Sequence, residues 1–202
     1  FMNFIGGNKA LRTQYTKYLV ERVIQRMNIY PAKLYICDDE EGSLKDCASK
    51  AEFYSTKASE AGDMLNAVYD LLEERKNELQ KIDINVLPFV YVVINSPEAI
   101  ERIADSGGGA KVKEIVSTMK DMRVFILFSN VEDEQVSFSG SDIMKMIRDS
   151  KRFICFHDLK EVKITDIPMS ISKVFKKPLT NKEAYLINGS NVEKIHIVEA
   201  TK

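Results

Sequence analysis

The sequence predicts an α/β protein in which helices flank a mostly parallel sheet, and three observations support this fold class. Segments with strand and helix patterns alternate along the chain, which is the order that builds a parallel sheet with helices on both faces. Residues 89–94 (FVYVVI) form a short, unbroken, β-branched run, as expected of a central strand covered on both sides. Near the C-terminus, Asn188-Gly189-Ser190 separates two apolar segments and predicts an antiparallel hairpin at the edge of the sheet.

The first half of the chain is expected to supply three strands and two long helices. Leu65, Val68 and Leu72 recur at helical spacing, so they predict an amphipathic helix with one apolar face. Pro31 closes the preceding helix, because proline cannot continue the backbone hydrogen bonding. The expected elements are a truncated strand ending at 4–5, a helix at 11–27, a strand at 33–38, an irregular stretch at 39–59, a helix at 61–81 and the strand at 89–94. The acidic run at 38–41 is interpreted as a solvated loop, with partner contact or metal binding as alternatives.

The second half continues the alternation, so we expect one domain over residues 1–202 without an internal boundary or repeat. The apolar run at 124–128 (VFILF) predicts another buried strand. The triplet Gly107-Gly108-Gly109 predicts a flexible break between two helices. The expected elements are a helix at 98–104, a helix at 112–119, the strand at 124–128, a helix from 141, a strand at 152–156, a short helix at 169–175, and hairpin strands at 184–187 and 192–198.

Length and composition are those of a globular protein and exclude several classes. A chain of 202 residues can bury roughly 70% of the surface of its unfolded state, so its core needs no disulfide or metal. The net charge of -1 lacks the basic excess of a nucleic-acid-binding protein, so we expect no nucleic acid partner. No apolar run approaches the roughly 18 residues of a transmembrane helix, and the three widely spaced cysteines are expected to be reduced thiols. The start Phe1-Met2-Asn3 is unusual for a native N-terminus, so we expect a fragment of a larger multi-domain protein.

The segment from Gly6 to Thr13 resembles a phosphate-binding loop that has lost its chemistry. The template is a buried strand, then G-x-x-x-x-G-K-[ST], then a helix. Gly6 and Thr13 stand at the right spacing, but Leu11 occupies the position of the second glycine and Arg12 that of the lysine. In such a loop the backbone curls around the β-phosphate, and a non-glycine residue in a left-handed conformation costs roughly 1–2 kcal/mol. Thr13 keeps a hydroxyl that a metal could use, although Gly6, Gly7 and Thr13 also fit an ordinary strand-to-helix turn.

The strand at 89–94 ends where a magnesium-binding carboxylate would be needed, and the residue there is Asn95. Its amide lacks a charge whose attraction at about 4 Å is roughly 4 kcal/mol at an effective dielectric of 20. Ser96 takes the next position, where an acid would activate water. Glu98 is either a rescued base or, as we expect, a charge favoured by the dipole at a helix start. Together with Arg12, these departures predict no hydrolysis, no catalytic residue, no metal site and no bound cofactor such as ATP with magnesium.

Several short motifs resemble the FtsK/SpoIIIE ATPases of type VII secretion. Asp38 and the tripeptide 42–44 (GSL) stand where that family has an Asp and a G-S-L sequence after its second strand, and residues 71–75 (LLEER) match its Leu- and Arg-rich helix. Residues 88–100 resemble the family's Walker B strand and following turn. Ser129-Asn130 matches the polar pair after the next strand, which makes Asn130 the sensor-like residue. The likeness covers essentially the whole chain and is strongest to the third, C-terminal ATPase-like domain of EssC-type translocases.

This resemblance implies a RecA-like P-loop NTPase fold on the cytoplasmic side of a membrane-anchored secretion complex. It also implies that such a module binds the C-terminal signals of secreted helical-hairpin proteins, or controls the preceding ATPase domains of its own chain. An oligomer of the full-length protein is compatible with this resemblance. An amphipathic helix laid in an apolar groove is the expected mode of recognition. Two alternatives are a weak ATPase that uses Arg12 and Glu98 in unusual roles, and a purely structural module that packs against neighbouring subunits.

Overall fold

The chain folds around one eight-stranded sheet with the strand order β3-β2-β4-β5-β1-β6-β7-β8. The structure is a computed structural model that describes residues 1–78, 83–105, 108–118, 121–132, 141–164, 167, 169–175 and 178–197. Pairing is parallel from β3 through β6 and antiparallel for β7 and β8. The strands are β1 (Met2–Ile5), β2 (Ala32–Cys37), β3 (Phe53–Ser55), β4 (Phe89–Ile94), β5 (Val124–Val131), β6 (Arg152–Cys155), β7 (Glu183–Asn188) and β8 (Asn191–His196).

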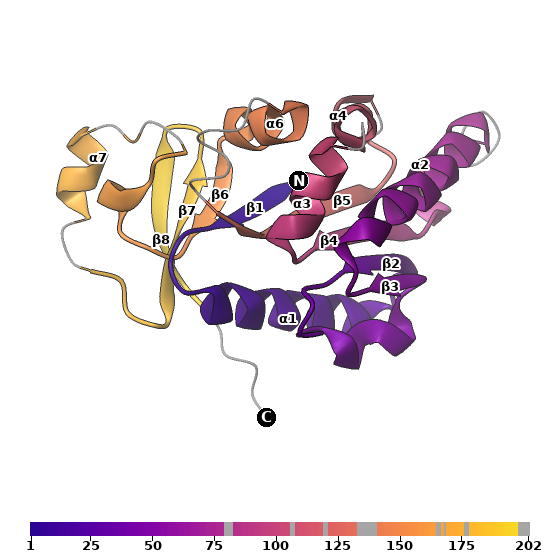
Figure 1. The fold of residues 1–202 in the computed structure, drawn as a ribbon, viewed down its shortest axis with the longest axis horizontal. Coiled ribbons are helices and arrows are strands. Elements are labelled where there is room, and N and C mark those ends of the chain that lie inside the picture. The colour runs from indigo at the N-terminus through magenta and orange to yellow at the C-terminus, as the bar shows by residue number, and fades with distance from the viewer. Residues whose placement is uncertain are drawn as a thin grey trace.

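Helices cover the two faces of the sheet unequally. Among the described helices, α2, α3, α4 and α6 lie over one face, whereas α1 runs along the other with the 3-10 turn η1 beside it (Figure 1). The helices are α1 (Lys9–Arg26), α2 (Ala61–Glu78), α3 (Pro97–Asp105), α4 (Gly108–Thr118), α6 (Asp142–Ser150) and α7 (Met169–Val174). Short 3-10 turns are η1 (Lys45–Lys50), η2 (Ala58–Glu60), η3 (Ile84–Val86) and η4 (Leu159–Glu161). Within the described residues, no helix has the length and apolar character needed to cross a membrane.

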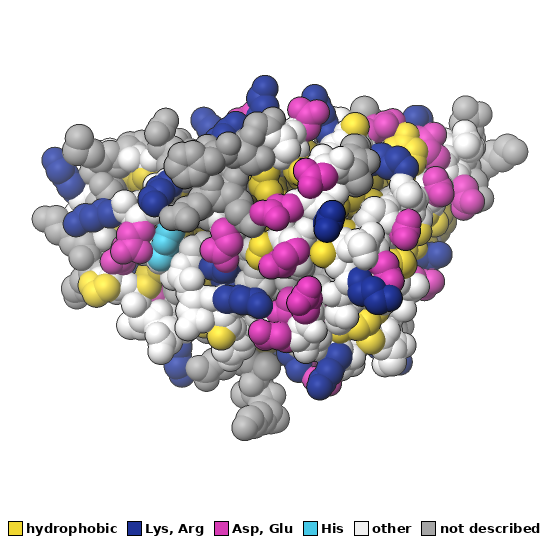
Figure 2. All heavy atoms as spheres, viewed as in Figure 1, with side chains coloured by type: hydrophobic (Ala, Val, Ile, Leu, Met, Phe, Trp, Pro, Cys, Tyr) yellow, Lys and Arg dark blue, Asp and Glu magenta, His cyan; other side chains and the backbone are white. Residues whose placement is uncertain are grey.

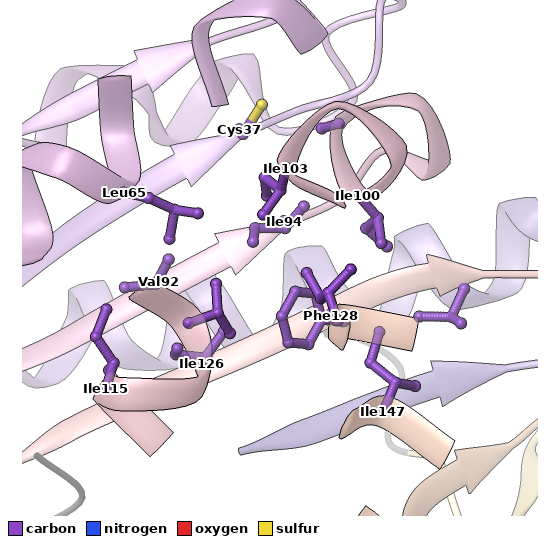
Figure 3. Close-up of a cluster of buried hydrophobic side chains, with 14 of the residues drawn as sticks. Cys37, Leu65, Val92, Ile94, Ile100, Ile103, Ile115, Ile126, Phe128 and Ile147 are labelled. Atoms are coloured by element: carbon purple, nitrogen blue, oxygen red, sulfur yellow. The ribbon is translucent and has the colours of Figure 1, made fainter. Parts of the chain in front are cut away.

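The larger core lies between the sheet and the four helices on its first face. Leu65 of α2 and Ile115 of α4 lie over Val92 and Ile126 of the central strands (Figure 3). All four side chains are at most 2% exposed, and burying each contributes roughly 1.5–3 kcal/mol relative to an exposed position. A second cluster packs under the sheet against α1, around Val20. Since alternate residues of β4 enter the two clusters, the run 89–94 serves both faces, as its unbroken apolar character predicts.

The fold class predicted from the sequence is confirmed. The sheet is mostly parallel, helices flank it, and β7 and β8 form the antiparallel pair joined by a turn at Gly189. β4 lies between β2 and β5 and is parallel to both, which places it centrally. Parts of three predicted elements, at residues 79–81, 119 and 198, lie outside the described residues.

Two local predictions are wrong. The stretch 39–59 contains β3, which pairs in parallel with β2 through Phe53, Tyr54 and Ser55. A three-residue strand is too short to show a period of two, so only its neighbour in the sheet reveals it. The glycine triplet is not a break at Gly108 and Gly109, because α4 begins at Gly108; Gly107 lies outside the described residues.

Candidate functional site

The loop between β1 and α1 depends on the two glycines Gly6 and Gly7. Their φ angles are 67° and 65°, a region that glycine adopts without steric cost. A Cβ on Gly7 would lie 2.3 Å from the carbonyl oxygen of Phe156, and one on Gly6 would lie 2.4 Å from the ring of His157. Asn8 then caps α1, since its side chain accepts a hydrogen bond from the backbone N–H two residues later at 2.7 Å. The segment that follows β6 therefore packs directly on this turn.

Arg12 fills the inside of the loop. The residue is 1% exposed, and its Nη1 donates to the carbonyl oxygens of Gly6 at 2.6 Å and Gly7 at 3.1 Å. Its Nε donates to Oδ1 of Asn130 at 3.1 Å, and its Nη2 forms an ion pair with Oε1 of Glu132, just after β5. The Glu132 side chain is 47% exposed. The guanidinium is thus buried, with its carboxylate partner at the rim of the site.

Arg12 gives the loop a polarity opposite to that of a phosphate-binding loop. A phosphate is held by backbone N–H groups that converge on it, whereas the carbonyl oxygens of Gly6 and Gly7 converge on a cation. All three guanidinium nitrogens have acceptors. A phosphate in this space would have to displace charge-assisted hydrogen bonds, which are about twice as strong as neutral ones.

A bulge in β5 brings Asn130 into the same site. The pairing of β1 with β5 shifts register between Asn3 and Ile5, and Asn130 has a φ of 58°, which asparagine tolerates better than most residues. Bulges re-aim side chains in this way beside functional sites. The Asn130 amide donates to Oγ1 of Thr13 at 3.1 Å and to Oδ1 of Asn95 at 2.9 Å. Asn130 thereby connects α1 to the end of β4.

Asn95 continues the chain of hydrogen bonds to β2. It is 0% exposed, and its Nδ2 donates to Oδ1 of Asp38 at 2.8 Å. The Asp38 carboxylate also accepts from the backbone N–H of Leu44 at 2.6 Å and from the hydroxyl of Tyr54 at 2.9 Å. Burial and this hydrogen bond raise the pKa of Tyr54, so the phenol remains a donor. The amide of Asn95 therefore cross-links two strand ends.

Ser96 and Glu98 form the N-terminus of α3. The Ser96 hydroxyl accepts from the backbone N–H of Ala99 at 3.1 Å and donates to the Glu98 carboxylate at 2.8 Å. Pro97 occupies the first helical position, where its missing N–H costs nothing. Glu98 is exposed in the first turn, where the helix dipole favours a negative charge. The two positions that would activate water in a hydrolase serve as a helix cap.

The predicted site residues therefore divide into two groups. One hydrogen-bonded network joins Gly6, Gly7, Arg12, Thr13, Asn95 and Asn130. Within the described residues, the side chains of Leu11, Ser96 and Glu98 form no hydrogen bond to that network. Leu11 is the third residue of α1 and packs, half-buried, against the cluster under the sheet.

The surface beside this network is acidic. Acidic side chains gather over α3 and between α3 and α1 (Figure 2), and α3 contributes the exposed Glu98 and Glu101. At the start of α1, the Nζ of Lys9 lies 3.5 Å from Oδ2 of Asp39 and 3.9 Å from Oε1 of Glu41. Such a field repels a polyphosphate. In the part of the chain that the structure describes, no group of three or more His, Cys, Asp or Glu side chains is placed to hold a metal ion.

The sequence marked Asp38 as a motif residue but did not predict that the carboxylates of Asp38 and Asp39 are buried. Asp38 and Asp39 are 0% and 3% exposed, so the interpretation of 38–41 as a solvated loop is wrong for these two residues. Asp39 accepts from the backbone N–H and the hydroxyl of Ser43 at 3.1 Å and 2.8 Å. The position of Asp38 at a strand end was a usable signal, because parallel strands end at one edge. The pairing of Arg12 with Glu132, separated by 120 positions, has no local sequence signal.

Comparison with solved structures gives matches over nearly the whole chain. EssC ATPases 2 and 3 from Geobacillus thermodenitrificans match 98% of the chain with a TM-score of 0.76 and 14% identity. The cytoplasmic domain of EssC matches 98% with a TM-score of 0.71 and 15% identity. The chain has the fold of an EssC ATPase domain. EccC ATPases 2 and 3 from Thermomonospora curvata, in complex with a signal sequence peptide, match 100% of the chain with a TM-score of 0.67 and 11% identity.

These matches confirm the resemblance to EssC-type ATPase domains at the level of the fold. The chain spans 36%, 39% and 37% of the lengths of these three structures. No family model and no curated protein sequence matches the chain. The comparisons therefore establish the fold of the chain, and the roles of its loop and strand-end residues rest on the hydrogen bonds described above.

Removal of the Arg12 guanidinium is expected to destabilise the chain strongly. Arg12→Ala leaves the buried carbonyl oxygen of Gly6 and the amide oxygen of Asn130 without their donor, so we expect a loss of about 1–3 kcal/mol in the free energy of unfolding for each. The stability of Arg12→Lys should lie between that of the unmodified chain and that of Arg12→Ala, because one ammonium group cannot reach all four acceptors. Urea unfolding measures both, with Arg102→Ala as an exposed control that changes stability by less than about 0.5 kcal/mol. If Arg12→Ala lowers the free energy of unfolding no more than the control does, the buried guanidinium does not stabilise the fold as we expect.

Two glycine substitutions separate backbone strain from steric exclusion. Gly7 and Gly189 have nearly the same φ, 65° and 63°, but a Cβ on Gly189 meets nothing within 4 Å. Gly189→Ala should therefore cost about 1–2 kcal/mol, the left-handed penalty alone. Gly7→Ala should cost roughly 2 kcal/mol more, since the clashing atom is a backbone carbonyl that cannot turn away. Equal thermal unfolding curves for the two variants would show that the Phe156 contact relaxes freely.

Proposed function

We propose that this chain is a non-hydrolysing ATPase-like module of a type VII secretion motor that recognises the signal segments of its substrates. The observation that carries the proposal is the buried guanidinium of Arg12 inside the β1–α1 loop, bonded to the carbonyls of Gly6 and Gly7. The fold of EssC and EccC ATPase domains supports a place in such a motor.

Three features argue against hydrolysis. Arg12 takes the space that a phosphate needs. Asn95 replaces the carboxylate for magnesium and is bonded on both sides, to Asp38 and Asn130. The adjacent Ser96 caps a helix. Each change removes a different requirement of phosphoryl transfer, namely the anion cradle, the metal and the activated water.

One structurally similar protein favours a role in recognition over a purely structural role. A structurally similar protein, EccC ATPases 2 and 3 from Thermomonospora curvata, is known in complex with a signal sequence peptide. In this proposal the cargo of the present chain is a secreted helical-hairpin protein, and its neighbours are the ATPase domains of the same polypeptide. The module works on the cytoplasmic side of a membrane-anchored assembly.

Calorimetric titration with ATP and magnesium tests the loss of nucleotide handling. We expect no saturable heat up to millimolar ATP, because the loop offers carbonyls and a paired cation to the phosphates. Magnesium chloride without nucleotide provides the baseline. Micromolar, magnesium-dependent affinity would overturn the proposal and favour a weak ATPase that uses Arg12 and Glu98.

Capture of a purified helical-hairpin substrate tests recognition. The immobilised chain is expected to bind the intact substrate in biolayer interferometry and to lose it when the C-terminal signal segment is deleted. The deleted substrate is the matched control, since its helical hairpin remains. If the chain does not bind the intact substrate, either by itself or together with the substrate's partner proteins, the proposed recognition role is wrong.

A further inference from the structure

Exposed apolar side chains gather at the edge of the sheet where the parallel strands begin. Within the described residues, five large hydrophobic side chains are exposed, and four of them lie here. Ile29 (72% exposed) and Tyr30 (56%) precede β2, Val86 (68%) precedes β4, and Phe125 (38%) is the second residue of β5. Because β2, β4 and β5 are adjacent and parallel, these four side chains share the edge opposite to the Arg12 network.

A groove of about 540 Å³ opens beside them, between the C-terminal half of α1 and the underside of the sheet. We call it the amino-edge groove. Its floor is a row of aromatic rings, with centroids 6.0 Å apart for Phe89 and Tyr91 and 6.2 Å apart for Tyr91 and Phe125. Leu19 and Val23 of α1 form its wall. An aromatic floor with an aliphatic wall is typical of sites that bind apolar side chains.

The groove exists because α1 covers only part of this face. Residues Phe89, Tyr91 and Val93 of β4 point to the α1 side, but only Val93 is buried, at 4% exposure. α1 has 18 residues and lies along this face, whereas α2, α3, α4 and α6 cover the other in the part of the chain that the structure describes (Figure 1). The half of the face nearest the strand starts is therefore left open, although its residues are as apolar as those of the core.

The rim of the groove is cationic. Arg22 and Arg26 line it, both exposed, and the guanidinium of Arg123 lies 3.8 Å above the ring of Phe89. None of the three arginines has an ion-pair partner among the described residues, and no acidic residue lines the groove. By contrast, Lys17 on the same helix lies 2.5 Å from Asp46. The unneutralised charge selects for carboxylates in whatever covers the groove.

The occupant docks through side chains rather than by adding a strand. The groove lies on a sheet face, and the backbone groups of β4 pair with β2 and β5 on both sides. An extended segment would find no free edge to pair with. A helix satisfies its own backbone hydrogen bonds and presents apolar side chains at i, i+3, i+4 and i+7, which suits an aromatic floor beneath a charged rim.

We propose that the amino-edge groove binds an amphipathic helical segment that carries carboxylates beside its apolar stripe. This inference rests on the proposed function, for which it supplies the recognition surface and the chemistry of the segment recognised. Apolar side chains of the helix contact Phe89, Tyr91 and Phe125. Its carboxylates pair with Arg22 and Arg26 at the rim.

Two synthetic peptides test the proposal directly. Both are 18-residue amphipathic helices with the same leucine stripe and one tryptophan; one carries glutamates beside the stripe and the other lysines. The chain contains no tryptophan, so peptide fluorescence reports binding alone. We expect the glutamate peptide to bind about tenfold more tightly than the lysine peptide, and the double variant Arg22→Glu/Arg26→Glu to reverse this preference, in line with two exposed ion pairs.

Single substitutions of the floor separate docking from general charge attraction. Tyr91→Ala and Phe125→Ala should each weaken the glutamate peptide about tenfold, as central aromatic contacts do. Arg102→Glu on α3, over the opposite face of the sheet, is the matched control and should leave affinity unchanged. Thermal unfolding of each variant verifies that the fold is retained.

Several results would overturn the proposal. Equal affinity for both peptides, no saturable binding of either, or binding insensitive to Tyr91→Ala would each do so. Sedimentation that shows a dimer dissociated by Phe125→Glu would assign the groove to a second copy of the chain instead. If the Arg22→Glu/Arg26→Glu variant captures the helical-hairpin substrate with unchanged affinity, the groove assignment fails while the recognition function stands. If the unmodified chain captures no substrate, the proposed function itself fails.

Discussion

The buried guanidinium of Arg12 is the interaction on which the loop and its surroundings depend. It contacts the turn after β1 through Gly6 and Gly7, and the end of β5 through Asn130 and Glu132. A buried cation is tolerated only when acceptors surround it, so each of these partners is constrained by the arginine. The same geometry directs a cation and two carbonyl oxygens into the loop, and this is the observation on which the proposed loss of nucleotide chemistry rests.

Beyond Arg12, polar side chains cross-link the strand ends. A continuous series of hydrogen bonds runs from Arg12 through Asn130 and Asn95 to Asp38. Amides suit this use because each is both donor and acceptor and brings no charge. The strand ends that would hold a metal and a water in a hydrolase are therefore tied to one another. The network ties this edge of the sheet together, while the opposite edge keeps exposed apolar surface and arginines that form no ion pair among the described residues.

The sequence predicted the elements better than the site. Alternating apolar runs gave the central strand Phe89–Ile94 and the long helices, since these signals are local and repeat over many residues. The strand at Phe53–Ser55 was missed because three residues carry no period. The carboxylates of Asp38 and Asp39 were assigned to solvent, because acidic runs usually are, yet buried donors surround both.

The sequence by itself determined the fold class and the glycine turn at residues 6–7, because each follows from residue type and spacing. It also predicts the loss of the groups that phosphoryl transfer requires. Only the tertiary structure decided what the replacements do. Arg12 and Glu132 meet across 120 positions, and Asn95 reaches Asp38 across 57, since the parallel sheet gathers distant strand ends at one edge. The amino-edge groove likewise depends on tertiary packing. The apolar sequence of β4 and β5 does not show whether a helix covers their side chains.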